Sequence, residues 1–239
     1  MTPRKPRRSI NRRVTVRDVA ARAGVSQPTV SLVLGNHPTA RVAAETRERV
    51  LQAAAELGYR PNVIARGLAT RRSYAIGLVV PDLRNPLYAE MVLGAERVAA
   101  QSGYAVLLCD ASELPAHRHL ETLRERLVDG VILQGMGAAT LGDGALDGLN
   151  VVLADELSDA VPHVASDAGG AGRLAAEHLV GLGHRRIAFV GPASLSHAFR
   201  MRERGFVQAL RAAGVVLDTD RLRRAPATVK GGEQAMKAL

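Results

Sequence analysis

The spacing of apolar residues changes once along the chain, near residue 73. Before that point, apolar positions recur three or four residues apart, which is the period of an amphipathic helix. After it, short runs of Val, Ile and Leu alternate with helical stretches. Such alternation is typical of a parallel sheet that helices cover on both faces. The pattern therefore predicts a small all-α domain followed by an α/β domain.

Residues 15–34 predict two short helices joined by a tight turn. Thr15 and Asp18 have the spacing of a capping box, and Ser26 is a suitable cap for the second helix. Gly24 stands where the first helix needs a residue that tolerates a positive φ. The second helix is expected to bury its valines and to expose four residues on its outer face: Gln27, Pro28, Ser31 and Leu32.

Two helices of this length around a glycine turn form the helix-turn-helix of DNA-binding proteins, whose second helix enters the major groove. An ordinary helical hairpin is the alternative. Residues 44–57 predict a third helix, which would close a small domain and end at Gly58. Residues 61–72 are basic and predict a short helix or linker, which is marginal by itself.

Five apolar runs of the second half predict strands, at residues 75–80, 105–109, 130–133, 151–154 and 187–190. Helices are expected between or beside them, at residues 86–102, 116–127, 170–182 and 200–213. Ligands of parallel sheets bind beyond the carboxyl ends of the strands. Polar residues gather at those ends: Asp82, Arg84, Asn85, Asp110, Ser112, Gln134, Asp155 and Glu156.

Charge is divided unevenly along the 239 residues, whose formal net charge is +9. Residues 1–72 hold 15 Lys+Arg and 4 Asp+Glu, a net charge of +11, so the remainder carries −2. This division indicates a polyanion-binding module joined to a nearly neutral domain. A membrane-surface role is the rival interpretation, but the amphipathic helix with Trp or Phe anchors that it favours is missing. Residues 1–13 are expected to form a disordered basic arm, either touching phosphates or simply solvated.

Several classes of function lack their signals. Cys109 is the only cysteine, which leaves no disulfide framework and no cysteine zinc site. We find no phosphate loop, nucleophile elbow or metal-ligand spacing, so no catalytic residue, metal or cofactor is expected. No apolar run is long enough to span a bilayer, and no apolar segment follows the basic N-terminus, so a cytoplasmic protein is expected. Two rival hypotheses are a solute-binding protein without DNA function and an α/β enzyme with a fused helical cap. The first would need an export signal, and none is present. The second would need a catalytic set at the strand ends, where we find only isolated polar residues.

Ordered motifs along residues 14–239 resemble the LacI/GalR family of bacterial transcriptional repressors. The matching motifs include residues 14–26, 45–50, 57–62, 76–82, 126–132, 182–189 and 202–206. The resemblance implies a homodimer that places two recognition helices in successive major grooves of a pseudo-palindromic operator. By the same resemblance, Gln27, Pro28 and Leu32 read bases, while Thr29 and Ser31 contact phosphates. Gln reads adenine bidentately, whereas Leu32 offers only an apolar contact.

The resemblance also implies a hinge helix at residues 62–69 that orders on DNA. Leu68 matches a leucine that wedges into the minor groove and kinks it; a core leucine is the alternative. Gly67 replaces a commoner serine or alanine and should make folding of the hinge costlier. Six further residues are expected at DNA-contacting positions: Thr15, Ser26, Asn36, Asn62, Ala65 and Arg66.

The second domain is expected to resemble periplasmic binding proteins, with two lobes and a sugar-like or purine effector between them. Five residues match effector-binding positions: Asp82, Asn85, Asp155, Asp167 and Arg202. Ala168 stands where the family frequently has asparagine. Family members usually continue well beyond residue 239, so the second lobe is expected to be incomplete. The alternative function is a truncated regulator that binds DNA only weakly and has lost its response to an effector.

The expected domains are the arm (1–13), the helix-turn-helix domain (14–60), the hinge (61–72), the first lobe (73–168) and a partial second lobe (169–239).

Overall fold

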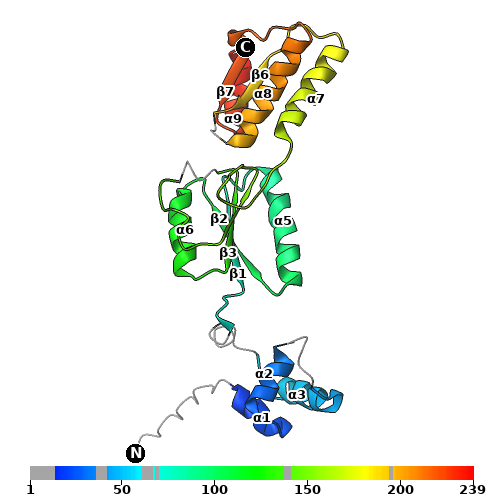
Figure 1. Ribbon diagram of the computed structural model, residues 1–239, viewed down its shortest axis with the longest axis vertical. Coiled ribbons are helices and arrows are strands. Elements are labelled where there is room, and N and C mark those ends of the chain that lie inside the picture. Colours follow the sequence, from blue (N-terminus) through cyan, green and yellow to red (C-terminus); the bar gives the residue numbers. More distant parts are fainter. Residues whose placement is uncertain (1–13, 36–41, 61–66, 68–69, 137–140, 194–195) are drawn as a thin grey trace, which may run out of the picture. The chain divides into compact units, whose positions relative to one another are not determined.

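The computed structural model describes residues 14–35, 42–60, 67, 70–136, 141–193 and 196–239. It consists of two compact units, Met1–Ser73 and Tyr74–Leu239, whose helices and strands are labelled in Figure 1. The first unit contains helices α1 (Val16–Ala23), α2 (Gln27–Leu34) and α3 (Ala44–Glu56). These helices pack around one apolar core, made of Val19, Ala20, Ala23, Val30, Val33, Val50, Ala53 and Ala54.

Local sequence signals set the ends of the first two helices. Thr15 and Asp18 form the predicted capping box at the start of α1, with the Thr15 amide donating to Asp18 Oδ2 at 2.8 Å. Gly24 ends α1 in the left-handed region, with φ of 67°. Ser26 then caps α2, where its Oγ accepts a hydrogen bond from the Thr29 amide at 3.3 Å. The predicted helix-turn-helix is therefore confirmed down to its caps.

The second unit begins with the predicted parallel sheet. Its strands are β1 (Ala75–Val80), β2 (Ala105–Asp110), β3 (Gly130–Gln134), β4 (Val151–Ala154) and β5 (His163–Val164). They lie in the order β2-β1-β3-β4-β5, and every pair is parallel. This order reverses direction next to β1, and doubly wound sheets bind ligands beyond the strand ends at such a point.

Two helices sandwich this sheet, as Figure 1 shows: α5 (Pro86–Gln101) on one face and α6 (Ala116–Glu125) on the other. Alternation along β1 explains why both faces are apolar, because successive strand residues point to opposite sides. Leu78 and Val80 join the cluster that contains residues of α5, whereas Val79 joins the cluster with Leu120 and Leu123 of α6.

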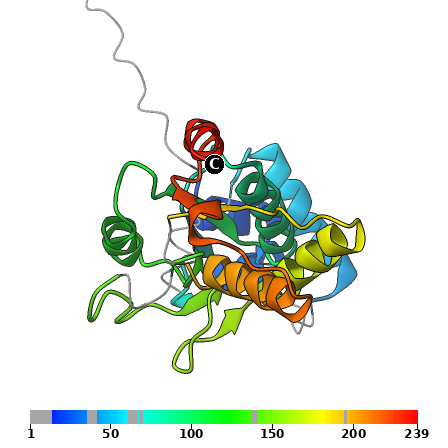
Figure 2. The same ribbon diagram turned by 90° about the horizontal axis from the view of Figure 1, so that it is seen from above.

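The second lobe contains α7 (Ala168–Gly181), β6 (Phe189–Pro192), α8 (His197–Ala212), β7 (Leu222–Ala225) and α9 (Val229–Lys237). A short 3-10 helix, Thr219–Arg221, precedes β7. Strands β6 and β7 pair in parallel, with α8 as their crossover. Helices α7 and α8 run side by side in both views of the molecule (Figure 1 and Figure 2). Glycines bring the two helices close together. A Cβ at Gly172 of α7 would overlap the Arg202 carbonyl of α8, and one at Gly205 would overlap the Gly169 carbonyl.

The predicted elements differ from the structure mainly in the second lobe. Strand β6 begins two residues later than the apolar run that predicted it, and α8 begins three residues earlier than predicted. Strand β7 was missed because its sequence, Leu-Arg-Arg-Ala, has none of the apolar runs that identified the other strands. Only its pairing with β6 makes this segment a strand.

Candidate functional sites

The outer face of α2 presents polar and apolar side chains to solvent. Val30 and Val33 are buried, whereas Gln27, Pro28 and Ser31 are exposed. Leu32 is 40% exposed, a large fraction for a leucine in so small a domain. Helix α2 therefore has one face that holds the domain together and another that is free to contact a partner.

Two residues expected at DNA-contacting positions also cap helices of the domain. Thr15 and Ser26 are the caps of α1 and α2, and Ser26 Oγ also lies 2.9 Å from Thr29 Oγ1. Helix N-termini carry unpaired amides that favour phosphate groups, so capping does not exclude a phosphate contact. Five of the expected residues lie outside the described part of the chain: Asn36, Asn62, Ala65, Arg66 and Leu68.

The end of the predicted hinge is described at a few positions. Gly67 and Thr70 are helical, and Arg71 follows with φ of 53°. The Arg72 amide donates to the Gly67 carbonyl at 3.2 Å. A left-handed residue with this bond is the usual C-terminal helix stop, although glycine normally takes the left-handed position.

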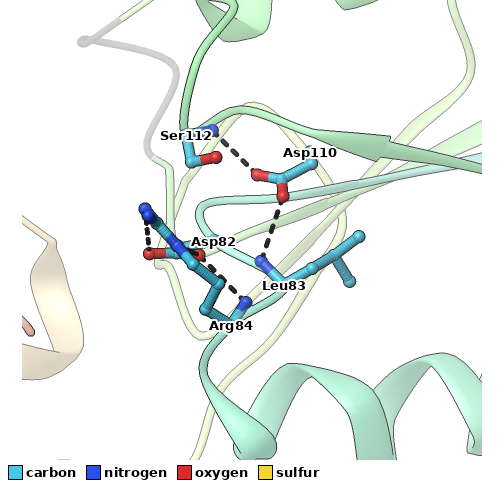
Figure 3. A network of polar contacts seen from close by, with 5 residues as sticks. All are labelled: Asp82, Leu83, Arg84, Asp110 and Ser112. Atoms are coloured by element: carbon cyan, nitrogen blue, oxygen red, sulfur yellow. Dashed lines mark hydrogen bonds and ion pairs between the residues drawn. The ribbon is translucent and has the colours of Figure 1, made fainter.

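The carboxyl ends of β1 and β2 form a fixed polar rim (Figure 3). The Asp110 carboxylate accepts hydrogen bonds from the Leu83 amide at 3.3 Å and from the Ser112 amide at 2.8 Å, which ties the two loops together. The Ser112 amide and hydroxyl and the Leu83 amide together keep the pKa of Asp110 below its usual value despite partial burial.

Asp82 lies on this rim but is already paired. Arg84 donates to its two carboxylate oxygens through Nε at 2.8 Å and Nη2 at 2.9 Å, and the Arg84 amide adds a third bond at 2.9 Å. The Arg84 side chain is the main reason why the pKa of Asp82 is lowered. A bidentate pair is geometrically specific, so a ligand at Asp82 meets a carboxylate and a guanidinium together. Arg84 was named only as a strand-end residue, although its place two residues after Asp82 was the available signal.

Asp155 and Gln134 form a second polar pair, at the ends of β4 and β3. Gln134 Nε2 donates to Asp155 Oδ2 at 2.9 Å, and Ser166 bonds to Oδ1 through its amide and hydroxyl. Burial alone would raise the pKa of Asp155, but these bonds and the charge of Arg202 outweigh it and lower the pKa. Gln134 is 2% exposed, and its Oε1 has no partner among the described residues. Buried polar atoms are normally satisfied, so this oxygen is a candidate ligand acceptor. The sequence had indicated Gln134 only as a polar residue at a strand end.

The remaining expected effector residues occupy helix ends and faces. Asn85 caps α5 by accepting from the Leu87 amide at 3.1 Å, and Asp167 caps α7 by accepting from the Gly170 amide at 2.7 Å. Arg202 is exposed on α8, where its guanidinium carbon lies 5.7 Å from the centre of the Phe199 ring. Burial, with smaller contributions from the Asp155 and Asp82 charges, raises the pKa of the Tyr88 phenol beside these strand ends.

A cavity of about 610 Å³ lies between residues of the two lobes in the second unit. Asp82, Arg84 and Asn85 line it from the first lobe, and Phe199 and Thr228 are among the lining residues of the second. Its volume is in the range of small-molecule sites. Asp155, Asp167 and Arg202 are not among its lining residues, so the structure brings only part of the expected effector set to this cavity.

Glu156, indicated by the sequence only as a strand-end residue, links the two lobes through a contact that the sequence did not reveal. It follows β4 and is 4% exposed, and its Oε1 accepts a hydrogen bond from the His197 amide at 2.8 Å. His197 is the first residue of α8, so the carboxylate satisfies a free amide at the positive end of that helix. Because α8 carries Arg202, Glu156 helps to hold this arginine in position.

We expect Glu156→Ala to lower the free energy of unfolding of the second unit by about 1–3 kcal/mol, the cost of leaving a buried hydrogen-bonding group unpaired. Glu156→Gln keeps an acceptor and should lose less. Urea denaturation followed by circular dichroism measures both effects. Glu96→Ala, at an exposed position on α5, is the matched control. Equal losses in Glu156→Ala and Glu96→Ala would contradict the capping role.

Comparison with known proteins identifies both units. Residues 15–62 match the family model "Bacterial regulatory proteins, lacI family", and residues 73–239 match "Periplasmic binding proteins and sugar binding domain of LacI family". The chain belongs to the LacI family. It is 38% identical over 215 residues to the ribose operon repressor of Halalkalibacterium halodurans, covering 86% of this chain and 63% of that protein.

Two solved structures of this family are similar over most of the chain. The lac repressor dimer bound to operator and the anti-inducer ONPF is 28% identical, with a TM-score of 0.76. The complex of the transcriptional regulator CelR with cellobiose is 32% identical, with a TM-score of 0.62. Each alignment covers 95% of this chain and 70% of the other. The LacI-family chain thus spans about two thirds of the length of these proteins.

The family matches agree with two negative observations on the described residues. No group of three or more His, Cys, Asp or Glu in that part of the chain is arranged to hold a metal ion. No helix in the same residues is both long and apolar enough to cross a membrane. The family's members are transcription regulators rather than enzymes.

Proposed function

We propose that this LacI-family chain is a sequence-specific transcriptional repressor that binds a pseudo-palindromic operator as a homodimer. The observation that carries the proposal is the exposed outer face of α2, on a helix-turn-helix within the region of net charge +11. Positive charge supplies affinity for the phosphate backbone, and the exposed face supplies contacts to base edges. Acting on operator DNA places the protein in the bacterial cytoplasm, at the nucleoid.

Base reading is assigned to Gln27, Pro28 and Leu32, and phosphate contacts to Thr29 and Ser31. The exposure of Gln27 and Leu32 supports this assignment. The proposed phosphate and hinge contacts also include Thr15, Ser26, Asn36, Asn62, Ala65, Arg66 and Leu68.

We expect Gln27→Ala to relax base preference at one position of each half-site, because a bidentate contact contributes about 1–3 kcal/mol of discrimination. Competition among operators that carry each of the four bases at every position measures this. Gln52→Ala, at an exposed glutamine of α3, should leave the preference unchanged. If Gln27→Ala discriminates as well as the unaltered protein, Gln27 is not a reader.

Exposed apolar side chains support the proposed dimer. Helix α5 and the edge strand β2, which contact each other, expose large side chains by 41% to 60%: Leu87, Leu93, Val98 and Leu108. Exposed apolar surface of this kind marks protein interfaces, and self-association through one surface produces a two-fold dimer.

The effector is proposed to be a small sugar, bound near the strand ends of the second unit. The relatives named above include a ribose operon repressor and a cellobiose complex. A neutral polyol suits the paired Asp82 and Arg84, which offer an acceptor and a donor side by side. Sugar hydroxyls also suit Gln134 Oε1, which has no partner in the part of the chain that the structure describes, as well as Asn85, Asp155, Asp167 and Arg202.

The deciding experiment is a fluorescence-anisotropy titration of the full chain against DNA from upstream of its own gene and a shuffled control, at two salt concentrations. Specific binding should exceed control binding by about a thousandfold, with a steep salt dependence for both. Equal, weak, salt-sensitive binding to both would favour the alternative of a DNA-binding head that does not act as a dimeric repressor. No binding to either DNA would overturn the proposal.

A further inference from the structure

The second lobe contains a groove that none of the expected effector residues lines. It has a volume of about 560 Å³ and lies between α8 and the β6–β7 pair. Arg200, Arg204 and Arg211 line it from α8, and Arg224 lines it from β7. We refer to this as the arginine groove. The three helical arginines lie four and seven residues apart, a spacing that places them along one face.

The positive charge of the arginine groove is mostly uncompensated. Glu203 is the carboxylate that lines it, and Arg224 already engages it through Nε at 3.2 Å and through Nη2. The guanidinium groups of Arg200, Arg204 and Arg211 make no hydrogen bond or ion pair with the described residues. Like charges four residues apart destabilise a helix, so Arg200 and Arg204 together oppose the folding of α8. A bound anion would reverse the sign of this interaction.

Apart from Gln208, the rest of the lining is apolar. Phe189, Pro192, Phe199 and Val207 also face the groove. Small-molecule sites are typically several hundred Å³, mainly apolar and aromatic, with a few convergent polar groups. The arginine groove has this composition, which suits an organic anion better than a bare ion or a flat protein surface.

The second lobe as a whole carries a net positive charge, as the arginine groove does. Residues 169–239 hold 12 Lys+Arg and 5 Asp+Glu, a net charge of +7. Residues 73–168 hold 5 Lys+Arg and 14 Asp+Glu, a net charge of −9. The near-neutral balance of the second unit therefore conceals two oppositely charged lobes. A positive lobe raises the local concentration of anions around it.

We propose that the arginine groove binds a phosphorylated small molecule, with its phosphates on Arg200, Arg204 and Arg211 and its organic part against Phe189 and Phe199. Guanidinium groups suit phosphates because their fixed donors contact two oxygens at once. The groove shares Pro192 and Phe199 with the cavity between the lobes, but none of its four arginines lines that cavity. The two sites are therefore adjacent, and binding of a phosphate to the arginines does not depend on the proposed sugar site. It would give the regulator a second ligand, which reports on phosphorylated metabolites.

The test is isothermal titration calorimetry of the full chain with two probes, inorganic pyrophosphate and adenosine 5′-diphosphate, at physiological ionic strength. Adenosine is the uncharged control. Arg200→Gln/Arg204→Gln should weaken binding of both probes about tenfold or more, since a hydrogen bond to a charged group contributes upwards of a tenfold factor. Arg185→Gln/Arg186→Gln removes the same charge from exposed positions that do not line the groove, and should change affinity by less than about twofold.

Glu203→Gln supplies a test that misfolding cannot imitate. It removes the groove's carboxylate and releases Arg224, so both phosphorylated probes should bind about three- to tenfold more tightly. Equal weakening by the two double variants would show that the probes respond only to overall charge, including that of the DNA-binding unit. The proposal is overturned by that outcome, by failure of both probes to bind, or by a Glu203→Gln variant whose affinity for the probes does not increase. Operator binding is measured separately, so these outcomes do not depend on the repressor function.

Discussion

Replacing Gly172 by alanine should lower the free energy of unfolding of the second unit by about 3 kcal/mol, the upper range for overpacking a well-packed contact. Gly172 is a buried residue of α7, and a Cβ there would overlap the Arg202 carbonyl and approach the Phe206 amide of α8. Both are backbone groups, so no side-chain rotation relieves the overlap. Helix α8 must move away from α7, and Arg202 moves with it.

A matched control variant should change the free energy of unfolding in the opposite direction. Gly94 lies in the middle of α5, and a Cβ there would meet nothing within 4 Å. Alanine is the better helix former, so Gly94→Ala should raise the free energy of unfolding by about 0.5–1 kcal/mol. Urea denaturation of the two variants measures both changes. A stable Gly172→Ala variant would mean that α7 and α8 do not pack as closely as the structure shows.

Leu68→Ala should weaken binding to the specific operator about a hundredfold, while affinity for shuffled DNA changes by less than about twofold. The expectation follows from the proposed wedge, since unstacking a base step to bend DNA allows wider contact that a small side chain cannot secure. Non-specific binding depends on phosphate contacts, which the substitution leaves in place. Leu68 itself lies outside the described residues, and its assignment rests on the family resemblance.

The same anisotropy titration measures this effect on both DNAs. Leu51→Ala is the matched control, because Leu51 is a leucine of the same unit, on α3, and is 50% exposed. It should leave both affinities close to those of the unaltered protein. Parallel losses of specific and non-specific affinity in Leu68→Ala would instead indicate that Leu68 supports folding of the domain.

Local signals explain why so much of the first unit was predictable. The capping box of Thr15 and Asp18, the left-handed Gly24 and the Ser26 cap each act within a few residues of themselves. In the second unit, the continuous Val/Ile/Leu runs of β1 and β3 predicted a parallel sheet, which the register of these strands confirms. Such features depend on neighbours in sequence, so they can be recognised before any packing is known.

Apart from the local pair of Asp82 and Arg84, the features that failed to emerge from sequence are made by distant residues. Strand β7 contains two arginines and is a strand because it pairs with β6. Glu156 caps a helix that begins 41 residues later, and Arg224 engages a carboxylate 21 residues earlier. No periodicity or motif connects such positions in the sequence, because these residues become neighbours only when α8 packs in its lobe.

The sequence by itself determined the order of the elements, the two-unit division of charge and the outward face of α2, since caps, periodicity and charge are local properties of the chain. Tertiary structure decided which polar groups remain available. It tied Asp110 to the Leu83 amide, left Gln134 Oε1 buried without a partner among the described residues, and lined one groove with arginines from both α8 and β7. The physical reason is that hydrogen-bond saturation and electrostatic balance depend on what lies within a few ångströms, and packing alone fixes those neighbours.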